Sequence, residues 1–397
     1  MMDKTINYNS ILSFYRNKTV LISGHSGFKG TWLTKILLDA GAKIIGYSLP
    51  PPTSPSLMGI LGYDNSATKK SDLVNVFADI RDFAMLKKTF ETYEPDIVLH
   101  LAAQPIVRES YKEPRYTYET NVMGTVNICE CIRLSLNADH PVQSFLNVTT
   151  DKVYHNNEWS WGYRENEPLD GFDPYSNSKS CSELVTHSYI NSFFKNADSW
   201  KVPASTARAG NVIGGGDFAS DRIIPDCVRS VQSSRPLVIR NPNSTRPYQH
   251  VLEPLFTYLT IAAEQCAHHD LAGFYNVGPD DCDCVTTGEL VELFDKFYNT
   301  EKNEAGKKFA AQINHDPNAP HEANFLKLDT SLVKTTFGWK PTWHISEAIR
   351  NTVEWTKVWL IALKASGAAE DGKIYNTGVS KEVNEVMTKQ IREFIKG

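Results

Sequence analysis

Two short polar stretches of the sequence carry side chains that could act on an alcohol. In "DPYSNSK" (173–179), Tyr175 and Lys179 stand four residues apart, so both face the same side of a helix. A tyrosine can take a hydroxyl proton at neutral pH only if its pKa falls from about 10 to about 7, which requires about 4 kcal/mol of phenolate stabilisation. A Lys179 ammonium could provide part of it, and Thr150 could hydrogen-bond the same substrate oxygen. The spacing alone also fits an ordinary surface helix.

Asp151 and Lys152, in "NVTTDKVYHNN" (147–157), add a second kind of chemistry. Once one carbon of a sugar is a ketone, the proton on the neighbouring carbon becomes acidic because its removal gives an enolate. A deprotonated Lys152 is a reasonable base for that proton, and a protonated Asp151 is a reasonable acid for the hydroxyl beyond it. Together they could expel water. The alternative is that Asp151 caps a turn and Lys152 is exposed to solvent.

A glycine-rich turn lies between the first predicted strand and the first long predicted helix. Residues 19–23 form a short apolar run typical of a buried parallel strand, and Gly24, Gly27 and Gly30 follow with the spacing GxxGxxG. Glycines let the backbone approach a pyrophosphate, and a helix N-terminus supplies free N–H groups, so the arrangement predicts a dinucleotide site. The next strand, 43–48, ends without the acidic residue that often holds an NAD ribose.

Strands and helices alternate through the N-terminal part of the chain, which predicts a parallel sheet with helices on both faces. "VFADIRD" (76–82) places Asp79 after a strand, where it could accept from an adenine amino group or be an ordinary loop residue. "DIVLHLAAQP" (96–105) ends in small residues that would let backbone lie close to a cofactor. We therefore expect an α/β fold, a doubly wound parallel Rossmann sheet with a smaller mixed α/β substrate-binding domain.

The composition gives no sign of a polyanionic partner. Of the 397 residues, 41% are hydrophobic and 22% are charged, with a net charge of -5, so neither nucleic acid nor an anionic membrane is expected. No apolar run reaches the length of a membrane span, and the N-terminus lacks the apolar core of a signal peptide, so we expect a cytoplasmic protein. The seven cysteines favour reduced thiols. Cys282 and Cys284 form a close pair, but no His or Cys cluster completes a ligand set, so no metal is expected.

Residues 18–260 resemble the extended short-chain dehydrogenase/reductase family, and the resemblance narrows to the CDP-glucose 4,6-dehydratases. The segments that carry it are "SGHSGFKGTWL", "YSLPPPTSPSL", "HLAAQPIVRESY", "NVTTDKVYHNNEWSWGYRENEPL", "DPYSNSK", "ARAGNVIGGGDFASDRIIPD" and "NPNSTRPYQHVLEPL". Weaker similarity continues through residues 321–343. Related dTDP- and GDP-sugar dehydratases usually have a glutamate after the aspartate, so Lys152 is similar to the CDP-glucose branch.

The resemblance implies an internal redox cycle on CDP-D-glucose. NAD takes a hydride from carbon 4 with Tyr175 as base, assisted by Thr150 and Lys179. Water leaves across carbons 5 and 6 through Lys152 and Asp151, and the hydride returns to carbon 6 to give CDP-4-keto-6-deoxy-D-glucose. The resemblance also implies deoxysugar synthesis for a surface polysaccharide such as lipopolysaccharide O-antigen, and a homodimer formed through two helices of the cofactor domain.

The resemblance further implies which residues bind each ligand and how the chain divides. The expected NAD-binding residues are Gly24, His25, Gly27, Phe28, Lys29, Gly30, Asp79, Ile80, Leu101, Ala102, Ala103, Asn121, Tyr175 and Lys179. The expected substrate-binding residues are Gln104, Asn211, Arg222, Arg246 and Glu322. The predicted domains are 1–207 with 248–280 for NAD, 208–247 with 281–360 for the nucleotide sugar, and a C-terminal extension, 361–397.

Some features of the chain depart from the family pattern or leave other functions open. His25 stands in the glycine loop next to the pyrophosphate and the ribose-binding acid is missing, which predicts looser NAD binding, and His155 stands where the family more often has an Asp- or Asn-type residue. Another 4,6-dehydratase, or a nucleotide-sugar 4-epimerase or reductase of the same fold, is one alternative, although an epimerase has no need for Asp151 with Lys152. A catalytically idle NAD-binding regulator is another, against which the complete Thr-Tyr-Lys set argues.

Overall fold

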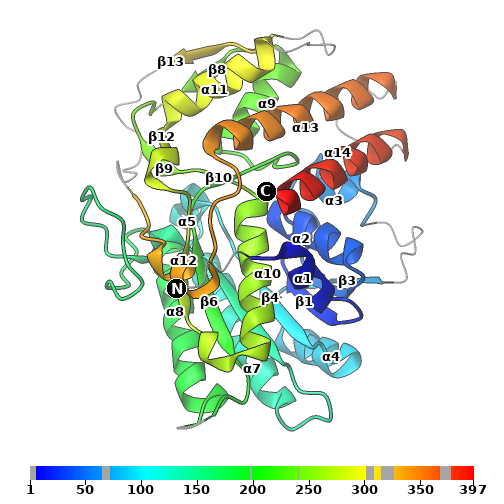
Figure 1. The fold of residues 1–397 in the computed structure, drawn as a ribbon, viewed down its shortest axis with the longest axis vertical. Coiled ribbons are helices and arrows are strands. Elements are labelled where there is room, and N and C mark those ends of the chain that lie inside the picture. Colours follow the sequence, from blue (N-terminus) through cyan, green and yellow to red (C-terminus); the bar gives the residue numbers. More distant parts are fainter. Residues whose placement is uncertain are drawn as a thin grey trace.

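A seven-stranded, all-parallel sheet forms the centre of the molecule (Figure 1). The structure is a computed structural model that describes residues 6–64, 72–196, 199–239, 241–300, 308–313, 326–366 and 377–397. The strand order is β3-β2-β1-β4-β5-β6-β11, so it reverses direction beside β1, the position at which such sheets bind ligands. The predicted doubly wound sheet is confirmed. The strands are β1 (Thr19–Ser23), β2 (Lys43–Ser48), β3 (Leu73–Phe77), β4 (Ile97–His100), β5 (Ser144–Thr150), β6 (Ala204–Ala209) and β11 (Phe274–Val277).

Helices cover both faces of this sheet because its strands are apolar on both sides. Val20 and Ile22 of β1 belong to the core that includes α1, α2 and α10, whereas Leu21 between them belongs to the core on the opposite face, with α4 and α7. Such continuous apolar runs are typical of parallel strands that are buried on both faces. The helices are α1 (Tyr8–Phe14), α2 (Phe28–Asp39), α4 (Phe83–Tyr93), α7 (Gly124–Ser135), α8 (Pro174–Tyr189) and α10 (Leu252–Ala267).

Shorter elements form the upper part of the molecule as it is drawn in Figure 1. Three two-stranded sheets pair β7 with β10, β9 with β12, and β8 with β13. Since β7 follows β6 and β10 precedes α10 in the chain, the first pair joins this part to the central sheet. The elements are β7 (Val212–Ile213), α9 (Ile223–Ser233), β8 (Leu237–Ile239), β9 (Thr245–Pro247), β10 (Gln249–His250), β12 (Cys284–Thr286), α11 (Thr287–Thr300) and β13 (Ala311–Ile313).

Two helices, α13 (Ile345–Ala365) and α14 (Thr377–Lys396), close the chain. Helix α14 is amphipathic and packs against α13. The Phe394 ring contacts the rings of Tyr8, Phe256 and Trp343, so the tail docks on its own core. The predicted boundaries after residues 207 and 360 fall inside β6 and α13, and the division into domains stays a prediction.

Short helices fill the remaining connections. They are α3 (Leu57–Ile60), α5 (Val107–Lys112), α6 (Pro114–Tyr118), η1 (Glu119–Met123), η2 (Asp151–Val153), η3 (Ile190–Phe194), η4 (His269–Leu271), η5 (Asp281–Asp283) and α12 (Ser331–Phe337). Among all the helices that the structure describes, none has both the length and the apolar character needed to cross a bilayer.

Candidate active site

A cavity of about 1540 Å³ opens at the carboxyl ends of the central strands. It is walled by the β1–α2 turn, by the ends of β4 and β5, by the start of α8 and by the segments around β7, β8 and β9. Most of the residues predicted from the sequence line it, namely Gly24, Gly27, Phe28, Lys29, Gly30, Asp79, Ile80, Leu101, Ala102, Ala103, Gln104, Thr150, Lys152, Tyr175, Lys179, Asn211, Arg222 and Arg246. His25, Asn121 and Asp151 are not among its lining residues, and Glu322 lies outside the described residues.

The glycine turn after β1 has the geometry of a phosphate cradle. Gly24 has a φ of 78°, and a Cβ there would lie 2.8 Å from the Ala102 backbone nitrogen, so only glycine fits. A Cβ on Gly30 would lie 2.1 Å from the Gly24 carbonyl oxygen, which explains the close contact of helix and turn. A Cβ on Gly27, which precedes α2, would meet only the Gly24 carbonyl oxygen, at an ordinary contact distance of 3.5 Å. The N-terminus of α2 therefore opens onto the cavity, with the space and the N–H groups that a pyrophosphate needs.

The His25 side chain lies behind this turn rather than in the cavity. Its ring nitrogens lie 2.9 Å from Ser48 Oγ and 3.0 Å from Asn75 Oδ1, in β2 and β3. Gly46 makes room for the ring, because a Cβ there would lie 2.2 Å from an imidazole carbon. Burial lowers the pKa of His25 to about 4, so the ring is neutral. The imidazole therefore packs behind the loop against β2 and β3, and the predicted position of His25 next to the pyrophosphate stays a prediction.

The end of β5 brings Thr150, Asp151 and Lys152 into one hydrogen-bonded group. The Asp151 side chain is buried, and its Oδ1 accepts from Thr150 Oγ1 at 2.9 Å and from Lys152 Nζ at 2.8 Å. Lys152 Nζ also donates to Asn211 Oδ1 at 3.3 Å. Asp151 Oδ2 is buried and has no hydrogen-bond partner among the described groups. The predicted acid therefore lies directly behind the lining residues Thr150 and Lys152, with one oxygen still able to accept a proton.

Tyr175 and Lys179 lie on the first two turns of α8. The helix begins as predicted, since the Asp173 side chain accepts from Ser176 N at 3.0 Å and Pro174 occupies the first turn. Burial raises the pKa of Tyr175 to about 12, against the lowering effect of a hydrogen bond with Thr150. Burial also lowers the pKa of Lys179 to about 8. In the protein alone, desolvation of the phenolate therefore outweighs the neighbouring groups that lower this pKa.

One turn further along α8, Glu183 holds a buried network that the sequence did not reveal. Its carboxylate accepts from Thr149 Oγ1, from Thr206 Oγ1 at 2.7 Å and from both Nε and Nη2 of Arg208 at 3.1 Å. Glu183 also opposes the lowering of the Lys179 pKa. Arg208 extends the network to the Tyr154 hydroxyl at 2.7 Å. The network thus joins α8 to the strands β5 and β6 beneath the cavity.

Basic side chains surround the part of the cavity assigned to the substrate. Arg246, on β9, is 6% exposed, and Arg222 pairs with Asp217 at 3.1 Å. Burial lowers the pKa of Lys29 to about 7, and Arg222 and Lys179 act in the same direction while Asp151 opposes them. Such a concentration of positive charge suits ligands that carry pyrophosphate groups.

The side chains of three other predicted binding residues form hydrogen bonds or ion pairs with other residues of the protein. The side chain of Gln104 bonds to the backbone of Ile106 through both its Nε2 and its Oε1. Asn121 donates to Ser178 Oγ at 2.8 Å and accepts from Gln104 N, so it links the β4 loop to α8. Asp79 pairs with Arg81 at 2.8 Å, and hydrogen bonds from Arg81 hold its pKa below the ordinary value. Their predicted contacts with ligands stay predictions.

An ion pair across the cavity was also missed by the sequence analysis. Arg108, in α5, lies 3.3 Å from Asp221 Oδ1, and both residues line the cavity. The two residues are 113 positions apart. No local pattern connects them, because their contact depends on how the chain folds. Glu183 did leave a local signal, since it follows Lys179 by four positions and must share its helix face.

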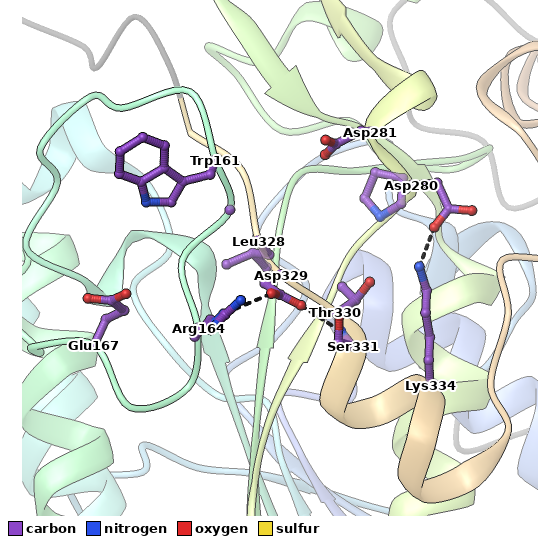
Figure 2. A pocket seen from close by; sticks show the side chains of 12 residues that line it. Trp161, Arg164, Glu167, Asp280, Asp281, Leu328, Asp329, Thr330, Ser331 and Lys334 are labelled. Atoms are coloured by element: carbon purple, nitrogen blue, oxygen red, sulfur yellow. Dashed lines mark hydrogen bonds and ion pairs between the residues drawn. The ribbon is translucent and has the colours of Figure 1, made fainter.

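A separate hollow of about 590 Å³ lies at the surface, between the 161–167 loop, residues 279–281 and the start of α12 (Figure 2). Its main charges are paired, Arg164 with Asp329 at 3.1 Å and Lys334 with Asp280 (Figure 2). The exposed Trp161 ring stacks on Trp159. The hollow shares no lining residue with the large cavity, so it is not part of the candidate active site.

Known proteins with similar sequences are nucleotide-sugar dehydratases. A CDP-glucose 4,6-dehydratase from Salmonella typhimurium is 43% identical over 354 residues, which cover 88% of this chain and 93% of the relative. A dTDP-glucose 4,6-dehydratase from Escherichia coli is 25% identical, over 81% of this chain and 92% of the relative. The family model for GDP-mannose 4,6 dehydratase matches residues 21–352.

Solved structures share the fold. The dTDP-glucose 4,6-dehydratase from Bacillus anthracis, in complex with NAD, superposes with a TM-score of 0.66 at 19% identity, covering 85% of this chain and 96% of that one. The UDP-glucuronic acid 4-epimerase from Bacillus cereus, in complex with UDP-glucuronic acid and NAD, has a TM-score of 0.69 at 21% identity, covering 85% of this chain and 99% of that one. On the strength of the family match and the 43% identical relative, the chain belongs to the GDP-mannose 4,6 dehydratase family, on the branch of the CDP-glucose 4,6-dehydratases.

Proposed function

We propose that the protein converts CDP-D-glucose to CDP-4-keto-6-deoxy-D-glucose and water, with NAD as a hydride carrier that is regenerated in each cycle. The 43% identity to a CDP-glucose 4,6-dehydratase, over nearly the full length of both chains, supports the reaction. The observation that carries it in this chain is the group at the end of β5, where Lys152 Nζ lies 2.8 Å from a buried Asp151 carboxylate.

The glycine turn and the N-terminus of α2 fit the pyrophosphate of NAD. Gly24, Gly27 and Gly30 would let it approach the backbone, and Ala102 would lie beside it. When bound, NAD accepts a hydride from carbon 4 of the sugar and returns it to carbon 6. The prediction that NAD binds more loosely here stays a prediction, and stoichiometric NAD retained through purification would contradict it.

Tyr175 would remove the proton of the hydroxyl on carbon 4. Thr150 would hydrogen-bond the same oxygen and orient it, because it reaches both Tyr175 and the cavity. Lys179, which donates to the Val148 carbonyl at 3.2 Å, would stabilise the phenolate as it forms. All three side chains come from the end of β5 and the start of α8, so a single sugar can touch them together.

One proton shift inside the Asp151–Lys152 pair would prepare both groups for the elimination of water. A proton that moves from Lys152 Nζ to Asp151 across their hydrogen bond leaves a neutral amine and a neutral carboxylic acid. The amine can then take the proton on carbon 5, and the acid can protonate the hydroxyl that leaves carbon 6. Asp151 Oδ2, which lacks a partner among the described groups, is the second carboxylate oxygen that could carry this proton.

Incubation of the purified protein with NAD and CDP-, dTDP-, GDP- or UDP-glucose tests the proposal. We expect an alkali-induced 4-keto chromophore, and a product lighter by one water, with CDP-glucose. CDP-galactose as the product would instead establish the 4-epimerase alternative. A chromophore with a different nucleotide would keep the dehydration and reject the cytidine. No turnover of any of the four sugars would favour the catalytically idle regulator.

We further propose a homodimer that acts in the cytoplasm and supplies deoxysugar for a surface polysaccharide such as O-antigen. Large apolar side chains are exposed on η1, α8 and η3, with Met123 49%, Leu184 53% and Phe193 40% exposed. A dimer formed through helices of the cofactor domain would cover such side chains. Light scattering on the eluted protein tests the dimer, and a monomer at micromolar concentration would reject it.

A further inference from the structure

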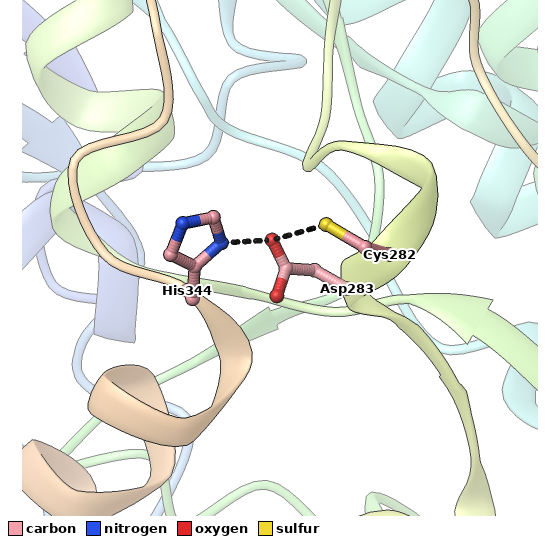
Figure 3. Close-up of side chains that lie close together, drawn as sticks. All are labelled: Cys282, Asp283 and His344. Carbon is pink, nitrogen blue, oxygen red and sulfur yellow. Dashed lines mark hydrogen bonds and ion pairs between the residues drawn. The ribbon is translucent and has the colours of Figure 1, made fainter.

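A cysteine, an aspartate and a histidine meet at the surface, away from the large cavity (Figure 3). Cys282 and Asp283 belong to the turn η5, and His344 lies 61 residues later, directly before α13. Their donor atoms all lie within 4.8 Å of one another. The sequence predicted no metal site because no His or Cys cluster completes a ligand set with Cys282 and Cys284, whereas the fold brings His344 to this turn.

We propose that Cys282, Asp283 and His344 form a surface binding site for a divalent transition metal ion, of which Zn²⁺ is the best match. Thiolate, imidazole and carboxylate are the three side-chain ligands that Zn²⁺ takes in proteins, at about 2.3, 2.0 and 2.0–2.2 Å. Three protein ligands plus water complete a tetrahedral site. Hard cations such as Mg²⁺ and Ca²⁺ prefer sites made of oxygen, so they fit this donor set poorly.

Two of the three distances between the donors, those to Asp283, are close to the values of a tetrahedral site. Both Cys282 Sγ, at 3.8 Å, and His344 Nδ1, at 2.8 Å, point at Asp283 Oδ2 (Figure 3). Around a tetrahedral Zn²⁺, bond lengths of this kind place sulfur about 3.5 Å and nitrogen about 3.3 Å from the carboxylate oxygen. The two contacts therefore need to change by only a few tenths of an ångström. Cys282 is exposed and the His344 side chain is 60% exposed, so both can make this adjustment.

The aspartate is already oriented for this role. Asp283 is 4% exposed, and its Oδ1 accepts from Ile345 N at 3.0 Å, which fixes the carboxylate against the start of α13. A helix cap alone would explain Oδ1, but it would not explain why a thiol and an imidazole both aim at Oδ2. A second interaction that fixes a ligand in this way is typical of metal sites.

The local charge also favours a cation at this position. Asp280 pairs with Lys334, and Asp281 lies 3.6 Å from Lys327, so among the described residues Asp283 is the acid of this turn that has no lysine or arginine partner. The Asp283 carboxylate lies 3.8 Å from the Cys282 sulfur, so the sulfur faces a negative charge. A dication would offset that charge and release the thiol proton when the sulfur binds it.

A bound metal would connect two parts of the nucleotide-sugar side. The turn η5 leads into β12, where Val285 pairs with Arg246 of β9, and His344 lies at the start of α13. The ion would thus tie the turn before β12 to α13. By mass action, it would raise the unfolding temperature of the protein.

The full-length protein, freed of metal and kept reduced with a phosphine, is titrated with Co²⁺ and then with Zn²⁺ in competition. We expect one equivalent of Co²⁺ to produce a thiolate-to-metal charge-transfer band, which Zn²⁺ removes. Cys282→Ser should abolish the band, and His344→Ala should weaken Co²⁺ binding at least about tenfold. Asp283 is left unchanged because its replacement would also remove the helix cap.

Matched controls are Cys266→Ser and His269→Ala, which change the same residue types outside this group and should behave as the unmodified protein. Circular dichroism checks that each variant is folded, and the Zn²⁺-dependent rise in unfolding temperature is measured for each. The proposal is overturned if Co²⁺ gives no thiolate band, or if the band and the temperature rise are the same in Cys282→Ser and His344→Ala as in the controls. Because Cys282→Ser replaces one exposed atom, its loss of the band cannot be attributed to unfolding.

Discussion

Two acid–cation pairs lie at the carboxyl ends of neighbouring strands, and they differ in how completely the carboxylate is bonded. Glu183 and Arg208 are 1% and 3% exposed, and both oxygens of Glu183 accept hydrogen bonds. Asp151 is equally buried, but Lys152 is 27% exposed, and one oxygen of Asp151 has no partner among the described groups.

The difference separates a structural pair from a reactive one. A fully bonded buried network fixes its members, because any change leaves a charge or a donor unsatisfied. A buried carboxylate oxygen that lacks a partner is costly, and a catalytic role is one reason to retain it. The contrast therefore predicts that the first pair matters for stability and the second for turnover.

Replacement of Asp151 by Asn should have the largest effect and should fall on activity. The amide cannot shuttle the proton that the elimination needs, so we expect turnover of CDP-glucose to fall by about 10²–10⁴-fold. The 4-keto chromophore measures the loss. The first step should survive, so NADH absorbance should build up when the variant is mixed with NAD and substrate. Turnover within tenfold of the unmodified protein would contradict the assigned role.

Replacement of Glu183 by Gln should have an effect of similar size that falls on stability. It leaves the Arg208 guanidinium buried without a counter-charge, which costs about 3–5 kcal/mol. Chemical denaturation measures the free energy of unfolding. The double variant Glu183→Gln with Arg208→Met should recover part of the loss because it removes the stranded charge. A loss below about 1 kcal/mol in the single variant would show that the network is not structural.

The strands and the helix around both pairs could be predicted from the sequence, because these elements depend on local patterns. The strands 19–23 and 43–48 were predicted with the bounds that the structure gives, and the helix expected for residues 173–179 is confirmed by α8. These signals come from apolar runs and capping residues, which act within a few positions of the chain.

Burial of charged side chains could not be predicted in the same way. A glutamate on a polar helix such as α8 is normally exposed, and only the partners on β5 and β6 make Glu183 internal. The same holds for His25, whose ring turns toward the space left by Gly46 on another strand. The position of Asp151 behind the cavity lining likewise depends on packing against Gly210. Each of these outcomes is decided by contacts between distant segments.

The buried, neutral His25 is a third internal group that we expect to affect stability. Its pKa is about 4 in the folded protein and about 6.5 in the unfolded chain, so the unfolded chain binds the extra proton between these values. Stability from this group is present above pH 6.5 and decreases as pH falls toward 4, by up to about 1.4 kcal/mol per pH unit. Denaturation of the protein and of His25→Asn, at several pH values without NAD, should give a shallower slope for the variant. Equal slopes would mean that the pKa of His25 is the same in the folded protein and in the unfolded chain.

The exposed pair of Arg164 and Asp329 provides the smallest expected effect and the sharpest control (Figure 2). Its nitrogen–oxygen distance is 3.1 Å, the same as that of Arg208 and Glu183, but the Arg164 side chain is 72% exposed. Water screens this pair, so Arg164→Ala should lower the free energy of unfolding by no more than about 1 kcal/mol, and less in high salt. If Arg164→Ala destabilised the protein as strongly as Glu183→Gln, then distance alone would account for both pairs. Burial would then not explain why loss of the Glu183 charge destabilises the protein.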